Sequence, residues 1–211
     1  MQVSRRWLLT NVASFSALLC LPHFAMSQGK GQFKGQVATR WSENGRDMIL
    51  TDPFEYIAPD GKRWPVPRGT SVDGASIPRF FWTAIGGPFE GPYRNASVIH
   101  DFYCQVRTRP YLEVHRVFYE AMQTSGVSET KSWLMYQAVS NFGPRWGGPK
   151  IDPKCEIVDD NYDFKYCARN FVKPTLEQPD LDRDRVEKFL NEVRADPQDI
   201  ADLRAALPQL R

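Results

Sequence analysis

The stretch YRNASVIHDFYCQV, residues 93–106, decides the fold of the central part of this chain. Its apolar residues recur every three or four positions, which is the spacing of one face of an α-helix. They are Tyr93, Ala96, Ile99, Tyr103 and Val106. The preceding Gly91-Pro92 puts a proline at a first helical position, where its missing N–H leaves no bond unmade. We therefore expect an amphipathic helix here with one buried face.

Two further helices are predicted downstream of this stretch. The first begins at Pro110 and ends at Gly126, which can adopt the left-handed conformation of a helix cap. The second is capped by Ser128 and stopped by Gly143-Pro144. Their inward stripes are Tyr111, Val114, Phe118, Ala121 and Met122, and then Leu134, Met135, Ala138, Val139 and Phe142. Because the connections are short, we expect the three helices to be antiparallel neighbours.

Residues 32–66 carry strand and turn signals instead. Two short β-type runs, 37–41 and 48–51, flank a segment whose Asn44-Gly45 is typical of a tight hairpin. In residues 54–57 apolar and polar side chains alternate as in a strand. Pro59-Asp60-Gly61 is typical of a turn, and residues 62–66 form another short β-type run. The predicted fold is therefore α+β, with a small N-terminal antiparallel sheet packed with three antiparallel helices and followed by a C-terminal helical tail.

The composition is that of an ordinary globular protein. The 211 residues are 42% hydrophobic and 13% aromatic, which excludes a wholly disordered or coiled-coil chain. The formal net charge of +2 is too weak to indicate a nucleic-acid partner. Beyond the N-terminus no apolar run reaches the ~18 residues of a spanning helix, so we expect no transmembrane segment there.

The first 27 residues resemble an export signal. They contain no Asp or Glu, begin with Arg5-Arg6, continue through an apolar stretch and end in Ala25-Met26-Ser27. We predict a signal peptide over 1–27, cleaved after Ser27, and a location in the periplasm or outside the cell. The surrounding Ser4 to Leu9 also resembles a twin-arginine signal. A membrane anchor is the alternative, although the apolar stretch is short and ends at a proline.

The remaining chain divides into a domain, a linker and a tail. We expect the α+β domain over 28–150, with its core over about 45–147, and an irregular linker over 151–179. The linker carries Cys155 and Cys167, which we pair in a disulfide because the compartment is oxidising, while Cys104 is expected to be a small buried hydrophobe. Residues 180–211 form an amphipathic helical tail, which either packs on the domain or binds a partner.

Several ordered blocks resemble one known family. They are residues 66–78 (VPRGTSVDGASIP), 96–103 (ASVIHDFY), 116–122 (RVFYEAM), 135–139 (MYQAV) and Phe142-Gly143. In order and spacing they are similar to a phage and bacterial group, domain-of-unknown-function family 1353, over roughly residues 45–147. The resemblance implies a domain and no activity. The family usually has an Asp where this chain has His115, so any site carried over from the family is altered at that position.

The polar residues in these blocks form the candidate site. His100 and Asp101 lie on or beside the inward stripe of the first helix, and a buried His needs a hydrogen-bond partner. The obvious partner is His115, one turn before Phe118 on the next helix. Upstream, Asp73 and Ser76 belong to a turn signature that either connects sheet to helices or presents both side chains beside a cleft.

Three roles are open for this set. His100 can be a hydrogen-bonded core residue, a general base, or a metal ligand. As a base it would be oriented by Asp101 and aided by Asp73, Ser76 and His115, in a weak local likeness to the His-Asp helix of secreted phospholipase A2. In that likeness Asp101 and Asp73 would hold calcium, whereas a mixed nitrogen and oxygen set would suit zinc.

Two classes of function follow. The first is a periplasmic hydrolase of an ester or lipid that uses the His-Asp site, with calcium as the possible cofactor. The second is a non-enzymatic module that binds a lipid or another cell-envelope component through exposed aromatic residues or the tail. The aromatic candidates are Trp64, Phe80, Phe81, Trp82, Tyr93, Tyr103, Trp133 and Trp146, most of which we expect in the core.

Overall fold

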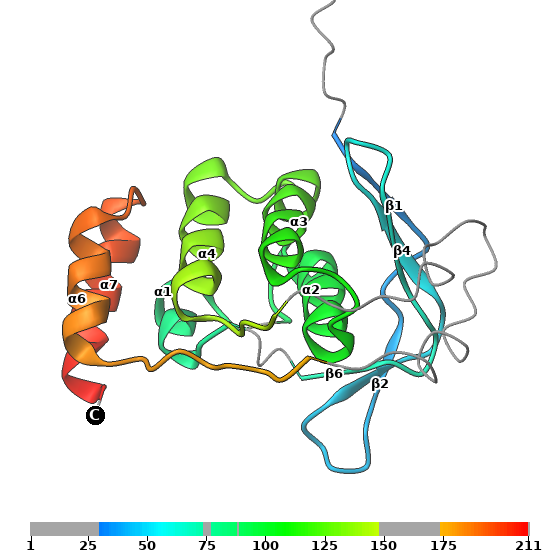
Figure 1. Cartoon of the computed structure of the whole chain (residues 1–211), viewed down its shortest axis with the longest axis horizontal. Coiled ribbons are helices and arrows are strands. Elements are labelled where there is room, and N and C mark those ends of the chain that lie inside the picture. Colours follow the sequence, from blue (N-terminus) through cyan, green and yellow to red (C-terminus); the bar gives the residue numbers. More distant parts are fainter. Residues whose placement is uncertain (1–29, 74–76, 88, 148–173, 211) are drawn as a thin grey trace, which may run out of the picture.

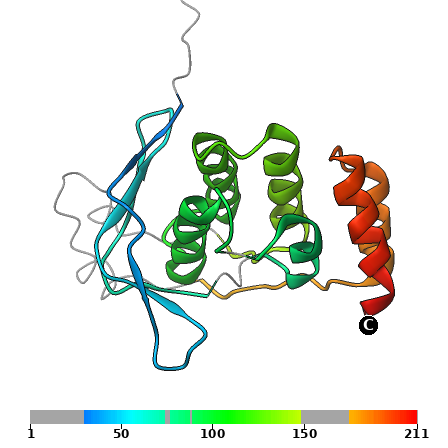
Figure 2. The same ribbon diagram turned by 180° about the vertical axis from the view of Figure 1, so that it is seen from behind.

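The structure is a computed structural model, and it describes residues 30–73, 77–87, 89–147 and 174–210. Figure 1 shows three helices in the middle of the molecule, the strands on one side of them and a helical hairpin on the other. The reverse view in Figure 2 shows the same order of layers. The predicted α+β class is confirmed. The signal peptide of residues 1–27 and the predicted Cys155–Cys167 bridge lie outside the described residues.

The strands form two antiparallel sheets of three strands each, where one sheet was expected. The first has the order β1 (Gln32–Lys34), β4 (Phe54–Ile57), β5 (Arg63–Val66), and the second the order β2 (Thr39–Trp41), β3 (Met48–Leu50), β6 (Ser71–Val72). The predicted hairpin joins β2 to β3, with Trp41 opposite Met48. Its turn forms because Gly45 adopts a φ of 67° and the Asn44 side chain accepts hydrogen bonds from two following backbone N–H groups.

The three predicted helices are α2 (Arg94–Val106), α3 (Tyr111–Thr124) and α4 (Glu129–Phe142). Two of the predicted punctuation residues are confirmed: Gly126 has a φ of 83°, and the Ser128 side chain accepts from the backbone N–H of Lys131. α3 packs between α2 and α4. The sheets join the helices through α2, where the Tyr103 hydroxyl donates to the Pro65 carbonyl of β5 at 3.2 Å.

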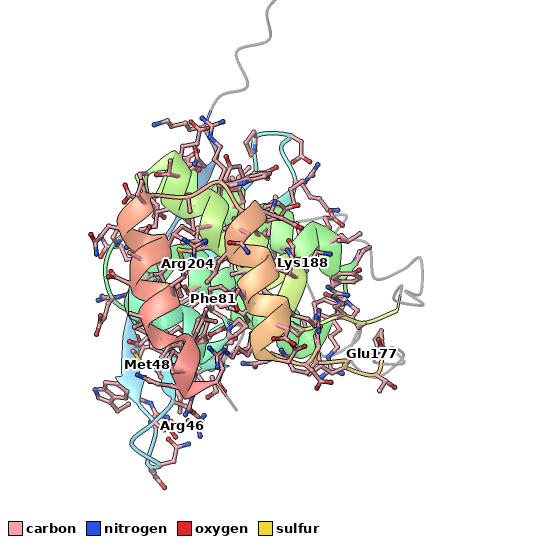
Figure 3. The ribbon with its side chains drawn as sticks, turned by 90° about the vertical axis from the view of Figure 1, so that its left-hand side faces the viewer. Arg46, Met48, Phe81, Glu177, Lys188 and Arg204 are labelled. Carbon is pink, nitrogen blue, oxygen red and sulfur yellow. The ribbon has the colours of Figure 1, made fainter. Side chains whose placement is uncertain are left out.

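The C-terminal helices are α6 (Arg183–Glu192) and α7 (Pro197–Ala206), followed by the short turn η3 (Leu207–Gln209). Each is capped by an aspartate, Asp182 before α6 and Asp196 before α7, so α6 begins three residues after the predicted Asp180. α7 packs on α1 (Trp82–Ile85) and on the turn η1 (Arg79–Phe81). Figure 3 shows Phe81 between α6 and α7, which run side by side in this view.

An aromatic cluster attaches this hairpin to the helices. The Phe189 ring of α6 lies 5.7 Å from Phe81 and 5.4 Å from Phe142 of α4, in edge-to-face geometry. All three side chains are buried. Such pairs contribute about 0.5–1.5 kcal/mol beyond the burial of their area. The tail thus packs on the domain, which is one of the two expected arrangements.

Most of the aromatic candidates are core residues. Trp64, Phe80, Phe81, Tyr93, Tyr103 and Trp146 are buried, whereas Trp133 is 37% exposed. Cys104 is buried, as expected. Within the four described ranges, each helix is too short or too polar to cross a membrane.

Candidate functional site

The predicted histidine pair is present at the seam between α2 and α3. His100 is 1% exposed and His115 is fully buried. His100 Nε2 lies 2.8 Å from His115 Nδ1, which confirms the expected partnership. α2 and α3 are antiparallel neighbours whose inward stripes face each other, and both histidines belong to those stripes. The two rings therefore meet as part of ordinary helix packing.

The hydrogen bonds of the pair fix its tautomers. His115 Nε2 lies 3.2 Å from the carbonyl oxygen of Pro144, which can only accept, so Nε2 carries the proton. In a neutral ring Nδ1 of His115 is then an acceptor, and His100 Nε2–H donates to it. This leaves Nδ1 of His100 as the unprotonated nitrogen of the pair. The chain of bonds runs from α2 through α3 to Pro144, the second residue after α4.

Burial keeps both rings neutral. Desolvation lowers the pKa of His100 well below its usual value, and the neighbouring His115 lowers it further. For His115, desolvation lowers the pKa to about 4, against a smaller raising effect of the Pro144 carbonyl, while nearby Arg145 adds to the lowering. At neutral pH the pair is an uncharged hydrogen-bonded unit.

Apolar and aromatic groups surround the pair. The His100 ring lies 4.6 Å from the Phe118 ring, and His115 lies 5.7 Å from Tyr111 and 6.5 Å from Trp146. Cys104 Sγ is 3.9 Å from Nδ1 and 3.8 Å from Nε2 of His100, so it contacts the ring without pointing at one nitrogen. The described surroundings thus supply packing to both rings.

The predicted acids stand in different surroundings. Asp101 is 2% exposed on α2, and half-buried Asp73 follows β6, a strand that packs on α2. Gln105 of α2 ties the two elements together by donating to the Ser71 carbonyl at 2.8 Å. Both acids have interaction partners, while Ser76 lies outside the described residues. The described ranges hold no group of three or more His, Cys, Asp or Glu side chains that could bind a metal. The calcium and zinc hypotheses stay predictions.

A second candidate site, which the sequence did not reveal, is a groove of about 920 Å³ between α4 and α6. Thr130, Trp133, Gln137 and Asn141 line one wall, on a single face of α4. Arg185, Lys188 and Glu192 line the opposite wall on α6, and Val193 and Arg194 follow them. Phe142 and Phe189 lie between the walls. The volume falls within the ~300–1,000 Å³ typical of small-molecule sites.

Aromatic side chains cluster on the α4 side of the groove. The Trp133 ring lies 5.9 Å from Tyr119 of α3 and 5.5 Å from Tyr136, and the two tyrosine rings are 5.7 Å apart. Burial, and then the nearby Glu129 carboxylate, raise the pKa of the Tyr119 hydroxyl, so it stays protonated and can donate a hydrogen bond. The groove therefore presents an aromatic face and a hydroxyl donor from the same side.

Cations from α6 and from the residues that follow it line the opposite wall. Arg185 is held by the fold, since it donates to the Asp180 carbonyl at 2.7 Å and lies over the Phe142 ring. Lys188 and Arg194 are exposed and form no ion pair within the part of the chain that the structure describes. Figure 3 shows Lys188 on the side of α6 away from α7, whereas Arg204 of α7 lies toward α6. Two exposed cations are thus available to a ligand in the groove.

Only the α4 wall of the groove could have been recognised from the sequence. Positions 130, 133, 137 and 141 are spaced by three and four residues, as expected for one helix face, and carry a Trp among polar residues. The opposite wall comes from residues some fifty positions later, and nothing in the sequence pairs the two. The groove therefore exists only in the tertiary structure.

The chain is similar to proteins of Sinorhizobium fredii (strain NBRC 101917 / NGR234). It is 52% identical over 97 residues to the uncharacterized protein y4jT, which covers 46% of this chain and 29% of that protein. It is 42% identical over 107 residues to the uncharacterized protein y4iH, covering 51% of this chain and 45% of the relative. The chain thus spans less than half the length of these curated relatives. No solved structure gives a significant match.

A family match supports the resemblance of the sequence blocks. It covers the α2–α3–α4 core almost completely and includes both histidines, but it stops before the last turn of α4 and before α6. The groove wall formed by α6 therefore lies outside the matched region. Residues 48–139 match the family described as a protein of unknown function, DUF1353.

Proposed function

We propose that this chain is an exported, non-enzymatic binding module of the cell envelope, and that the groove between α4 and α6 is its binding site. The observation that carries the proposal is that the polar groups of the two candidate sites differ in whether they are already hydrogen-bonded. The polar rings at the α2–α3 seam bond to each other inside the core, whereas the groove holds an exposed Trp133 and exposed cations beside a ligand-sized space. The buried histidine pair therefore stabilises the fold, whereas the exposed side chains beside the groove are available to a ligand.

Export gives the proposal its compartment. The acid-free segment that begins with Arg5-Arg6 and ends at Ser27 supports passage through a membrane by a cleaved signal peptide. N-terminal sequencing of the protein in its host tests this: a mature end at Gln28 is expected, and an intact Met1 on protein from the cytoplasm would contradict it. Lysine substitution of both arginines blocks export only if the twin-arginine route is used.

Co-sedimentation tests the binding itself. The purified chain is mixed with isolated cell envelopes of its host, and the bound fraction is compared for wild type, Trp133→Ala and Trp41→Ala. Trp41 is the matched control, because it is 63% exposed on β2, away from the groove. Loss of binding in Trp133→Ala alone is expected. Equal binding of all three proteins, or no binding by wild type, would refute the groove as the site.

An ester or lipid hydrolase acting through His100 is the second candidate. The observation that favours it is the bond chain to Pro144, which leaves Nδ1 of a neutral His100 unprotonated, as a general base must be. Asp101 is adjacent on the same helix, and Asp73 follows the strand that packs on it. The burial of His100 argues against this role, since a base for hydrolysis needs access to water.

The hydrolase is tested by assaying wild type, His100→Ala and Asp101→Asn on short- and long-chain esters and phospholipids, with calcium and with a chelator. A general base contributes about 10²–10⁴-fold in rate, so both variants would lose most of any activity while remaining folded. Variants that only unfold more easily, from a wild type that hydrolyses none of these substrates, would exclude the enzyme.

A further inference from the structure

We propose that the ligand of the α4–α6 groove is an acidic oligosaccharide, one that carries carboxylate groups on its sugar rings. This inference rests on the proposed binding function and adds the chemical class of the ligand. Three features of the groove carry it: an aromatic platform, planar amides beside that platform, and exposed cations on the facing wall.

The aromatic platform fits the apolar face of a sugar ring. Trp133 is exposed by 37%, and its neighbours Tyr119 and Tyr136 hold its ring through contacts of 5.9 and 5.5 Å. A ring that is held in place but open on one side offers contact area at little cost in conformational entropy. The C–H groups of a pyranose ring pack on such a surface while its hydroxyls point outward.

Polar groups along α4 match those outward hydroxyls. Thr130, Gln137 and Asn141 lie on the same helix face as Trp133, and the first and last of them are about 16 Å apart at the rise of an α-helix. Asn141 already donates to the Gln137 carbonyl at 2.8 Å, while the side-chain amide of Gln137 makes no hydrogen bond within the described residues. An amide offers both a donor and an acceptor, which suits pairs of adjacent hydroxyls.

The facing cations select an acidic ligand over a neutral one. Lys188 and Arg194 are exposed and form no ion pair within the described residues, whereas Arg185 lies 4.0 Å from the Asp182 carboxylate. Glu129 and Glu192 leave the groove with a small positive excess. Bonds from ammonium or guanidinium groups to carboxylate are shorter and stronger than neutral ones. A carboxylated sugar on Trp133 would place its negative charge opposite α6.

Shape argues against an anionic membrane as the partner. The groove is a space between two helix walls, and its principal aromatic is only partly exposed, so a flat lipid surface would not reach the residues between the walls. A membrane contact through apolar groups would instead require an exposed apolar patch. Vesicles are therefore included in the test as the competing outcome.

The test is isothermal titration calorimetry of the full chain with trigalacturonic acid, maltotriose and vesicles of phosphatidylglycerol. Trigalacturonic acid is expected to bind wild type about tenfold more tightly than neutral maltotriose, and vesicles are expected to give no heat of binding. Trp133→Ala should weaken trigalacturonic acid by about tenfold, and Trp133→Phe should recover most of the loss. Lys188→Glu should remove the preference for the acidic sugar.

Two controls match these variants. Trp41→Ala removes an exposed Trp outside the groove, and Arg183→Glu makes the same charge reversal on α6 at a residue that does not line it. Both should bind within twofold of wild type. The melting temperature of each variant is measured first and must lie within a few degrees of the wild-type value. A loss of binding then cannot be caused by a loss of folding.

The outcomes separate this inference from the proposed function. Equal affinity for the two sugars, unchanged affinity in both groove variants, or binding to vesicles in place of sugar would overturn the acidic oligosaccharide. If envelope co-sedimentation still depends on Trp133 in that case, the binding module stands and only its ligand class is wrong. If co-sedimentation is also lost or independent of Trp133, the proposed function fails as well.

Discussion

Polar side chains are buried and hydrogen-bonded at the α2–α3 seam but exposed in the α4–α6 groove. At the seam His100 and His115 are almost wholly buried and hydrogen-bonded to each other at 2.8 Å. In the groove Trp133 and the cations of α6 remain exposed around a space of about 920 Å³. The difference teaches that a motif matching a family, such as the His-Asp pair, can be satisfied within the fold, while an ordinary-looking helix face is left open.

The physical reason lies in what each helix packs against. α3 lies between α2 and α4, so both of its sides are covered, and the polar groups there must bond to protein. α6 contacts α4 through the rings of Phe189 and Phe142, and the groove lies beside that contact. A contact at one point leaves room beside it.

The largest expected effect on stability comes from removing Phe81, which holds α6 against the central helices. Phe81→Ala deletes a fully buried ring that contacts Phe80, Phe142 and Phe189. We expect the free energy of unfolding to fall by about 3–5 kcal/mol, measured by urea denaturation, because a large cavity opens in the core. Leu112→Ala is the control, since Leu112 is 58% exposed and should change stability by no more than about 0.5 kcal/mol. A loss under about 1 kcal/mol for Phe81→Ala would mean that α6 and α7 do not depend on this cluster.

The second largest effect is expected from lowering the pH, which should reduce the stability of the packing between α2 and α3. The folded pKa of His115 is about 4, below the unfolded value of 6.5, so between these values the unfolded chain binds more protons than the folded one. The stability contributed by the neutral ring is therefore complete above pH 6.5 and is lost as the pH falls toward 4, by about 3 kcal/mol for His115. His100 acts in the same direction.

Denaturation curves between pH 7 and 4 measure this loss. His115→Gln is the matched variant, because an amide keeps hydrogen-bonding capacity without titrating in this range. Its stability should fall less steeply with pH than that of wild type. Parallel pH profiles of the two proteins would show that His115 is not the group that titrates.

A smaller loss is expected from His100→Ala. The change leaves Nδ1 of His115 buried without its donor, which costs about 1–3 kcal/mol of unfolding free energy. His100→Gln, which restores a donor, should recover part of this loss. Chemical denaturation at pH 7.5 checks both variants, and an unchanged midpoint for His100→Ala would mean that the pair does not stabilise the packing of α2 on α3.

The smallest effect on stability is expected in the groove. Trp133→Ala removes a partly exposed ring from its contacts with Tyr119 and Tyr136, so the free energy of unfolding should drop by about 1–2 kcal/mol. A thermal melt beside that of Trp41→Ala measures it. A much larger loss would place Trp133 among the residues that maintain the fold, and would remove the contrast between groove and seam.

Local signals in the sequence predicted much of the scaffold. The Asn44-Gly45 turn, the left-handed Gly126 and the Ser128 cap all lie where the residue types required them. The helix boundaries followed, because caps and apolar periodicity depend on neighbours within a few positions. Even the pairing of His100 with His115 was predictable, since both lie on inward stripes of helices joined by a short connection.

The grouping of strands was less predictable. The runs at β2, β3, β4 and β5 were expected to form one sheet. Together with β1 and β6 they form two, because β4 pairs with β1 and β5 while β3 pairs with β2 and β6. Hairpin neighbours are local, but the pairings of β1 with β4 and of β3 with β6 join residues far apart in sequence. Their choice depends on how the sheets pack, which alternation alone does not encode.

The sequence by itself determined the α+β class, the three central helices with the Gly126 and Ser128 caps, and the burial of most aromatic residues, since each depends on periodicity or on the conformational preference of a single residue. Only the tertiary structure decided that Phe189 of α6 packs against Phe81 and Phe142, and hence that Trp133 faces Lys188 across a groove. The physical reason is distance along the chain: apolar burial is non-directional, so it indicates that α6 must pack somewhere without indicating where.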